Sequence, residues 1–266
     1  MIGEENIMNE NVDLHYYAIG DGFPLVLIHG WCSDGLSYAL QIPLAYKYRL
    51  ILPDLRGQGK SPKPQTKCTP ALLASDVNRL LERLGIGKAI MCGGSFGGLV
   101  TLQFVLDYPE KVGALILSDT ASTSAAASQF MSGCMALLSG PNAPEMLKGM
   151  ISQLASGSGM TNSPAVAMLI EASLERLAEM DPVSLLEVTK GMEGFDVTER
   201  LGEIKVPTLI IAGKRDLVIP PQHSEEMHKR IVGSKYVVID TEHGSPFFRP
   251  DEWNRAVQSF LESVNY

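Results

Sequence analysis

The chain has 266 residues, of which 45% are hydrophobic and 20% charged, so it has enough apolar side chains for a large core and does not have the composition of a disordered chain. Its length suits one large α/β domain or such a domain with an insertion. A net charge of −8, without any cluster of lysines or arginines, argues against nucleic acid as a partner. No apolar run approaches the roughly 20 residues that span a bilayer, and no signal-like segment begins the chain, so we expect a cytoplasmic protein with no membrane partner.

The first part of the chain alternates between strand-like runs and helical patterns. An alternating strand at residues 12–18 is followed by continuous apolar runs, typical of strands buried on both faces, at residues 24–28, 48–52, 89–92 and 112–117. Apolar positions at helical spacing between Pro70 and Leu84 predict a helix that ends at Gly85, and a second helix follows Gly98. This order, with short loops, predicts a mostly parallel sheet covered by helices on both faces.

The character of the sequence changes between about residues 122 and 200. Strand-like runs disappear, and eight of the twelve methionines lie here, some of them candidates for a soft lining over an apolar pocket. We therefore expect a helical cap at residues 122–200, inserted between a first core part (1–121) and a second core part (201–266). The expected cap helices cover residues 128–138, 145–154, 164–180 and 182–192.

The sheet pattern resumes after the insertion. Residues 206–212 and 236–239 predict two further strands, with helices expected at residues 221–231 and 250–264. The first of these strands leads to Asp216, and the second leads to His243. Because ligands of open α/β sheets collect at the carboxyl ends of the strands, both side chains are candidates for a site.

The segment that organises the chain is residues 89–100, an apolar run that breaks at two glycines, presents Ser95 and leaves through two more glycines. Gly93-Gly94-Ser95-Phe96-Gly97 fits the G-x-S-x-G pattern, in which a serine lies at a sharp turn from a strand to a helix. The amides at the start of that helix would favour an anionic oxygen beside the hydroxyl. Taken alone, the five-residue match also fits a glycine-serine turn without chemistry.

Ser95 is joined at the expected sheet edge by a base and two acids. A serine hydroxyl needs a base with a pKa near 7, which indicates a histidine, and the histidine needs a carboxylate to fix its tautomer. His243 lies in the short loop between the last strand and the last helix, where it serves as the candidate base. Asp216 is the preferred acid because it follows the penultimate strand in a loop that begins with a glycine. Asp119 is the alternative acid, and it lies at the end of the next strand after the turn that carries Ser95.

Several motifs together resemble an α/β-hydrolase-fold esterase or enol-lactonase with a helical cap. They are Leu27-Ile28-His29-Gly30-Trp31, the loop from Asp54 to Ser61, the serine turn, Gly213-Lys214-Arg215-Asp216 and Glu242-His243-Gly244. The resemblance implies that Ser95 attacks an acyl carbon, that His243 and Asp216 assist it, and that the backbone N–H groups of Trp31 and Phe96 form an oxyanion hole. Relatives that open epoxides or displace halide carry an aspartate at the position of Ser95.

The expected activity is therefore hydrolysis of a small carboxylic ester or lactone with an apolar portion, through an acyl-enzyme. The same three residues would also serve a C–C hydrolase, an amidase or peptidase, or a perhydrolase, and a ligand sensor without turnover is a further alternative. No cofactor or metal is expected, because the four cysteines form no CxxC pair and His223 and His228 do not share a helix face. The sequence leaves the oligomeric state open.

Overall fold

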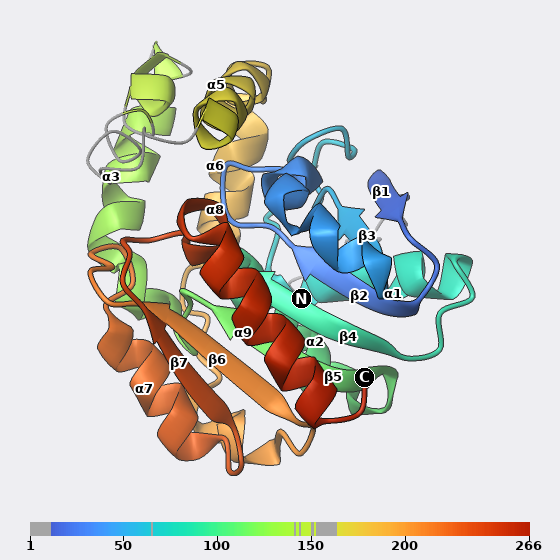
Figure 1. Ribbon diagram of the computed structural model, residues 1–266. Helices are drawn as coiled ribbons and strands as arrows, with labels where there is room; N and C mark the ends of the chain where they lie inside the picture. The colour runs from blue at the N-terminus through green and yellow to red at the C-terminus, as the bar shows by residue number, and fades with distance from the viewer. Residues whose placement is uncertain (1–11, 65, 141, 144, 150–151, 153–163) are drawn as a thin grey trace, which may run out of the picture.

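The computed structural model describes residues 12–64, 66–140, 142–143, 145–149, 152 and 164–266. A seven-stranded sheet with the strand order β1-β3-β2-β4-β5-β6-β7 forms its centre (Figure 1). Only β1 runs antiparallel to its neighbour among these strands, so the expected mostly parallel sheet is confirmed. The strands are β1 (Tyr16–Ile19), β2 (Phe23–Ile28), β3 (Tyr48–Pro53), β4 (Ala89–Gly94), β5 (Val112–Ser118), β6 (Thr208–Gly213) and β7 (Lys235–Ile239).

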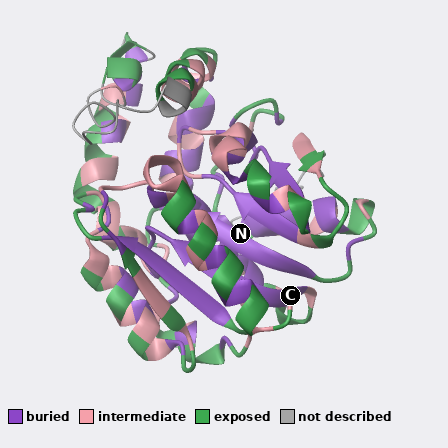
Figure 2. Ribbon diagram, viewed as in Figure 1, coloured by how far each residue is buried: buried purple, intermediate pink, exposed green. Residues whose placement is uncertain are grey.

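Helices cover both faces of the sheet. One face carries α1 (Pro70–Arg83), α2 (Phe96–Asp107) and α7 (Pro221–Arg230), and the other carries the 3-10 segment η1 (Gly35–Tyr46) and α9 (Pro250–Ser263). On α9 the buried side chains are Trp253, Val257, Phe260 and Leu261, a helical spacing that turns one stripe toward the strands and leaves the other side exposed (Figure 2). This arrangement confirms the expected coverage of both sheet faces.

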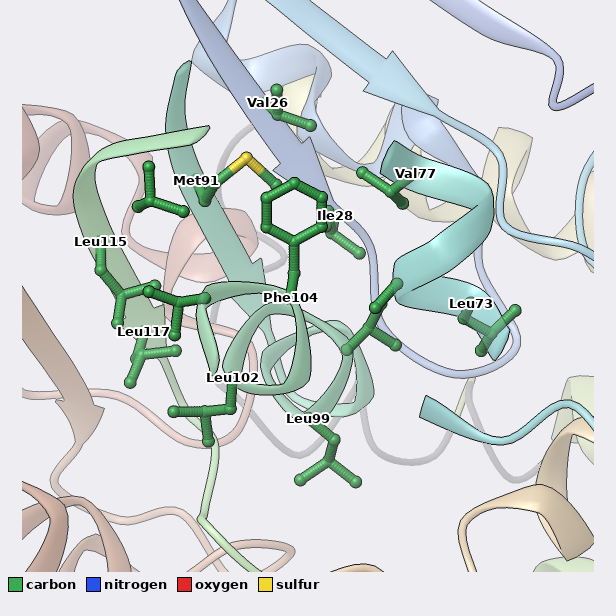
Figure 3. Close-up of a cluster of buried hydrophobic side chains, with 14 of the residues drawn as sticks. Val26, Ile28, Leu73, Val77, Met91, Leu99, Leu102, Phe104, Leu115 and Leu117 are labelled. Atoms are coloured by element: carbon green, nitrogen blue, oxygen red, sulfur yellow. The ribbon is translucent and has the colours of Figure 1, made fainter. Parts of the chain in front are cut away.

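Two buried clusters hold these layers together. In the cluster on the side of α1 and α2, the ring of Phe104 points from α2 toward the strands that carry Ile28 and Met91 (Figure 3). Val77 reaches the same cluster from α1, whose first turn is capped by Thr69 accepting a hydrogen bond from the Leu72 amide at 3.2 Å. The central strands are therefore covered on both faces, which is the physical reason for their continuous apolar runs.

The helices α3 (Ser128–Leu138), α5 (Pro164–Ala178) and α6 (Pro182–Gly191) gather at one end of the molecule, at the top of Figure 1. They form a small apolar cluster in which Leu138, Leu177 and Leu185 surround Cys32 of the core. The helix expected at residues 145–154 lies partly outside the described residues. The domain limits at residues 121 and 200 stay predictions.

The sequence patterns missed the η1 segment and several short elements. Residues 35–46 contain Pro43 and a non-helical residue at Tyr38, so they have no regular helical repeat of apolar positions. The first strand is also shorter than the alternating pattern suggests, because pairing with β3 begins only at Tyr16. The short helices are η2 (Pro109–Lys111), η3 (Ser124–Ala127), η4 (Thr198–Glu203) and α8 (Ser245–Phe248).

Candidate active site

Ser95 occupies a strained turn between β4 and α2. Its backbone has φ 53° and ψ −122°, a combination that non-glycine residues rarely adopt, and it presents the hydroxyl at the carboxyl end of the sheet. The flanking glycines make this turn sterically possible. A Cβ on Gly93 would lie 2.3 Å from the carbonyl oxygen of Gly97, and one on Gly97 would lie 2.2 Å from the carbonyl oxygen of Ile28. Any side chain at either position would push α2 away from the sheet.

The structure brings Ser95, His243 and Asp216 together in one hydrogen-bonded chain. His243 Nε2 lies 2.9 Å from Ser95 Oγ, and His243 Nδ1 lies 2.7 Å from Asp216 Oδ2. With the carboxylate accepting from Nδ1–H, Nε2 is left as the acceptor that faces the serine hydroxyl. These contacts join residues from three separate strand ends.

The carboxylate of Asp216 is itself held in place by the backbone. Its Oδ1 accepts hydrogen bonds from the amides of Val218 and Ile219, both at 2.8 Å, while Oδ2 faces His243. The side chain is 1% exposed, so water hardly competes for these oxygens. The orientation of the imidazole is therefore set by a carboxylate with little freedom to rotate.

Asp119, the alternative acid, contacts the loops on either side of the site. Its Oδ1 accepts from the Gly213 amide at 2.8 Å, and its Oδ2 accepts from the amide and hydroxyl of Ser245, both at 2.7 Å. Burial raises the pKa of Asp119, an effect opposed by the nearby His243 and by the hydrogen bonds from Ser245. Of the two candidate acids, Asp216 is the one that accepts a hydrogen bond from His243.

The pKa of His243 is raised above its usual value of 6.5. Burial alone lowers this pKa, but the hydrogen bond and negative charge of Asp216, together with the charge of Asp119, outweigh the burial. An imidazole with this balance takes up a proton readily when a neighbouring hydroxyl loses one. The raised pKa makes the imidazole a stronger base than a free histidine.

The loop after β2 lies directly against the serine. A Cβ added to Gly30 would lie 3.5 Å from Ser95 Cβ and 3.9 Å from Ser95 Oγ, so the backbone of Gly30 lies next to the serine. His29 holds this loop in place through both of its ring nitrogens. Its Nδ1 lies 2.7 Å from the Gly30 carbonyl oxygen, and its Nε2 accepts a hydrogen bond from the Leu55 amide at 3.0 Å. Burial lowers the pKa of His29, consistent with a neutral, structural ring.

Trp31 and Phe96, whose amides are expected to form an oxyanion hole, both line a small pocket at Ser95. Phe96 is the first residue of α2, so its amide has no acceptor within the helix. The Trp31 indole N–H donates to Thr189 Oγ1 on α6 at 2.9 Å, which ties the loop to the helices above the sheet. Sequence reasoning did not find Thr189, since nothing in its local pattern indicates a partner 158 residues away.

A cavity of about 850 Å³ opens at Ser95 and His243. Its walls are mainly apolar, with Phe130 from α3, Ile170 and Leu177 from α5, Val218 from the loop after β6, and Phe247 and Phe248 from α8. The charged pair at the wall, Arg215 and Glu242, is joined by a hydrogen bond of 3.1 Å. An uncharged apolar group suits such a space better than an anion does.

A second, small pocket of about 40 Å³ also reaches Ser95. Met131 and Met192 line it, so two of the methionines singled out in the sequence do contribute to an apolar lining beside the serine. Phe96 and Leu99 of α2 complete its inner side. The serine is thus accessible from two spaces of very different size.

The loop that begins at Asp54 is held by buried polar contacts. Asp54 accepts hydrogen bonds from the amides of Gly35 and Lys60, and Arg56 forms a bidentate ion pair with the buried Asp76. Within the described ranges, no three His, Cys, Asp or Glu side chains are arranged to hold a metal ion. Among the helices that the structure describes, none has the length and apolar character to cross a membrane.

Comparison with known proteins supports this architecture. Residues 24–142 match the family model described as the alpha/beta hydrolase fold. The chain is 26% identical to 3-oxoadipate enol-lactonase 2 of Acinetobacter baylyi over 98% of both chains. It is 39% identical to a soluble epoxide hydrolase of a Corynebacterium species, although that match covers 40% of this chain and 37% of the other.

Among solved structures, a thermophilic esterase from Thermogutta terrifontis superposes with a TM-score of 0.83 at 28% sequence identity. The superposition covers 96% of this chain and 95% of the esterase. These similarities agree with the structure on the fold, since the chain has a mostly parallel sheet with helices on both faces and a serine at the turn after β4. The chain has the α/β-hydrolase fold.

Proposed function

We propose that this protein is a serine hydrolase that cleaves a small carboxylic ester or lactone through an acyl-enzyme on Ser95. The observation that carries the proposal is the hydrogen-bonded chain from Ser95 through His243 to Asp216, at 2.9 and 2.7 Å, which opens into an apolar cavity. In the proposal, residues 122–200 form a cap over the core parts 1–121 and 201–266. This cap supplies Phe130, Ile170 and Leu177 to the cavity wall.

The geometry supports a two-step reaction. As Ser95 Oγ bonds to the acyl carbon, its proton passes to His243 Nε2, and the imidazolium is stabilised by Asp216. The tetrahedral intermediate then expels the alkoxide, which takes the proton from Nε2. Water enters next, gives a proton to His243 and attacks the acyl carbon, after which the acid leaves and Ser95 recovers its proton.

The negative charge of the intermediate requires donors beside the acyl carbon. The amides of Trp31 and Phe96 supply them in this proposal, since Phe96 begins α2 and Trp31 follows Gly30 next to the serine. The positive end of α2 adds to their effect. Losing one such donor typically costs about 2.7–4 kcal/mol of transition-state stabilisation.

The nucleophile and two of the relatives favour a carboxylic ester or lactone as the bond that is cleaved. Similarity to an esterase and to an enol-lactonase over nearly the whole chain supports a carboxylic ester or lactone. The similarity to an epoxide hydrolase is confined to 40% of the chain. In addition, a serine at position 95 forms an acyl ester with a carboxylic substrate, whereas the resemblance noted above associates epoxide opening with an aspartate at that position.

The test is a stopped-flow measurement of p-nitrophenyl acetate hydrolysis. We expect the parent to turn over and Ser95→Ala to lose the activity, while Ser139→Ala, at an exposed position on the C-terminal end of α3, retains it. Loss with Ser139→Ala, or full activity in Ser95→Ala, would contradict the proposal. A parent that leaves esters intact but cleaves a vinylogous diketone in a Ser95-dependent manner would show C–C hydrolysis instead.

A further inference from the structure

Ser95 is the meeting point of two spaces that differ about twentyfold in volume. The cavity of about 850 Å³ and the pocket of about 40 Å³ share Ser95, Trp31 and Phe130 among their lining residues. A space of about 10–15 Å³ holds one water-sized group, so the small pocket has room for about three such groups. The two parts of a substrate bonded to Ser95 therefore face very different limits on size.

The position of His243 assigns each space to one part of the substrate. Within the described part of the chain, His243 lines the large cavity and is absent from the lining of the small pocket. Its Nε2, which lies 2.9 Å from Ser95 Oγ, must deliver a proton to the oxygen of the leaving alcohol. That oxygen has to lie on the side of His243, so the alcohol extends into the large cavity.

The small pocket then receives the acyl chain. Phe96 lines the small pocket and not the large cavity among the described residues, whereas His243 lines the large cavity alone. The small pocket is thus the space at Ser95 that lies away from the histidine, and it is left for the acyl chain once the alcohol occupies the large cavity. Leu99, Met131 and Met192 contribute apolar side chains to its lining. A chain of about three carbon atoms fills such a volume, and a longer one exceeds it.

We infer that the preferred substrates are esters of a short-chain acid, of the acetate to butyrate class, with a larger apolar alcohol. This inference rests on the proposed function and narrows it. A lactone joins its acyl and alkoxy parts in one ring, and so it cannot send them separately into the two spaces. Open-chain esters fit the arrangement better. The large cavity also holds Arg215 already paired with Glu242, which leaves an uncharged alcohol as the suitable occupant.

The test compares two isomers, hexyl acetate and ethyl hexanoate. They have the same formula and nearly the same hydrophobicity, and differ in which side of the ester group carries the long chain. Initial rates of acid release, followed by pH-stat titration, give kcat/KM for each. We expect hexyl acetate to be preferred by about tenfold or more, because a few methylene groups that exceed the volume of a small apolar pocket are worth that much.

Equal rates for the isomers, or a preference for ethyl hexanoate, would overturn the inference while Ser95-dependent hydrolysis of either ester leaves the proposed function intact. Failure of both esters, with the Ser95→Ala variant as the reference, would overturn both. The preference between the two isomers is measured on the unmodified protein, so that preference does not depend on the folding of any variant.

A variant of the small pocket sharpens the assignment. Met131→Ala shortens a half-buried side chain that lines this pocket, and we expect it to raise the rate on ethyl hexanoate relative to hexyl acetate by about threefold or more. The matched control is Met168→Ala on α5, where the side chain is 71% exposed and lines neither space among the described residues. A changed ratio in Met168→Ala, or an unchanged ratio in a folded Met131→Ala, counts against the inference.

Discussion

The carboxylate of Asp119 accepts two hydrogen bonds from Ser245, one from its amide and one from its hydroxyl, each at 2.7 Å. Ser245 stands two positions after His243, and the other oxygen of Asp119 accepts from Gly213, three positions before Asp216. One buried carboxylate thus links the loops that carry the imidazole and its acid. Asp119 acts as a positioning residue in this arrangement, and its charge also contributes to the raised pKa of His243.

Replacing Asp119 tests this electrostatic contribution. In Asp119→Asn the negative charge that helps to raise the pKa of His243 is gone, so that pKa should fall. The proposed base must be neutral to accept the proton of Ser95. A pH–rate profile measures the effect. On the acid side of this profile, the midpoint of the fall in kcat/KM (the acid limb) should lie above pH 6.5 in the parent and move to lower pH in Asp119→Asn.

The same variant should be less stable. An asparagine has one carbonyl oxygen for the donor groups of Gly213, Ser245 and Ser118, and a buried donor without a partner costs about 1–3 kcal/mol in the free energy of unfolding. Asp107→Asn, at an exposed position on α2, serves as the control and should change neither quantity. An acid limb that stays in place in Asp119→Asn would show that its charge does not reach His243.

The contact between Asp216 and His243 predicts a large loss in Asp216→Asn. The carboxamide keeps an oxygen for the Val218 and Ile219 amides, but its NH2 then faces His243 Nδ1. That arrangement forces the proton onto Nε2, which can no longer accept from Ser95. We expect kcat to fall about 10⁴-fold with the fold retained.

Steady-state kinetics and circular dichroism check this expectation, with Asp251→Asn in the exposed first turn of α9 as the matched control. A loss of less than about tenfold would mean that Asp216 does not set the tautomer, because the wrong tautomer alone removes most of the rate.

The hydrogen bond from the Trp31 indole to Thr189 predicts that α6 positions the loop after β2, which carries the Trp31 amide. Thr189→Val keeps the shape of the side chain but removes the acceptor, so the loop loses its tie to α6. We expect kcat to fall about 10- to 100-fold, with little change in KM or in the pH of the acid limb, since the change affects only the placement of the Trp31 amide.

A double-mutant cycle provides the control for this contact. Trp31→Phe removes the donor, so adding Thr189→Val to it should cost much less than Thr189→Val costs alone. Strictly additive losses in kcat would show that the two side chains do not act through their mutual hydrogen bond.

The close packing around Gly97, in the turn that carries Ser95, predicts that Gly97→Ala and Gly133→Ala change the free energy of unfolding in opposite directions. Gly97→Ala would place a Cβ 2.2 Å from the carbonyl oxygen of Ile28, so α2 must shift away from β2. We expect a loss of about 1–3 kcal/mol or more in the free energy of unfolding by urea. Gly133→Ala, on α3 with no atom within 4 Å of the new Cβ, should instead stabilise by up to about 1 kcal/mol. Equal effects of the two changes would contradict this steric account.

The sequence by itself determined the strands, their mostly parallel pairing and the turn that presents Ser95. These features can be read from short windows of sequence. A continuous apolar run predicts a buried strand, a helical repeat of leucines predicts a helix, and a cluster of glycines predicts a sharp turn. The run from Ala89 to Gly94 became β4, and the leucines after Pro70 became α1. The η1 segment escaped prediction because Pro43 and the break at Tyr38 leave no such repeat.

The tertiary structure alone decided which carboxylate contacts His243. Asp119 and Asp216 follow β5 and β6, which are neighbours in the sheet, so by position along the chain either one could meet the imidazole. The choice depends on how the loops beyond the strands turn, and those turns are fixed by distant partners such as Ser245 and Gly213. The two spaces at Ser95 are likewise formed by side chains far apart in sequence, whose packing no local pattern records.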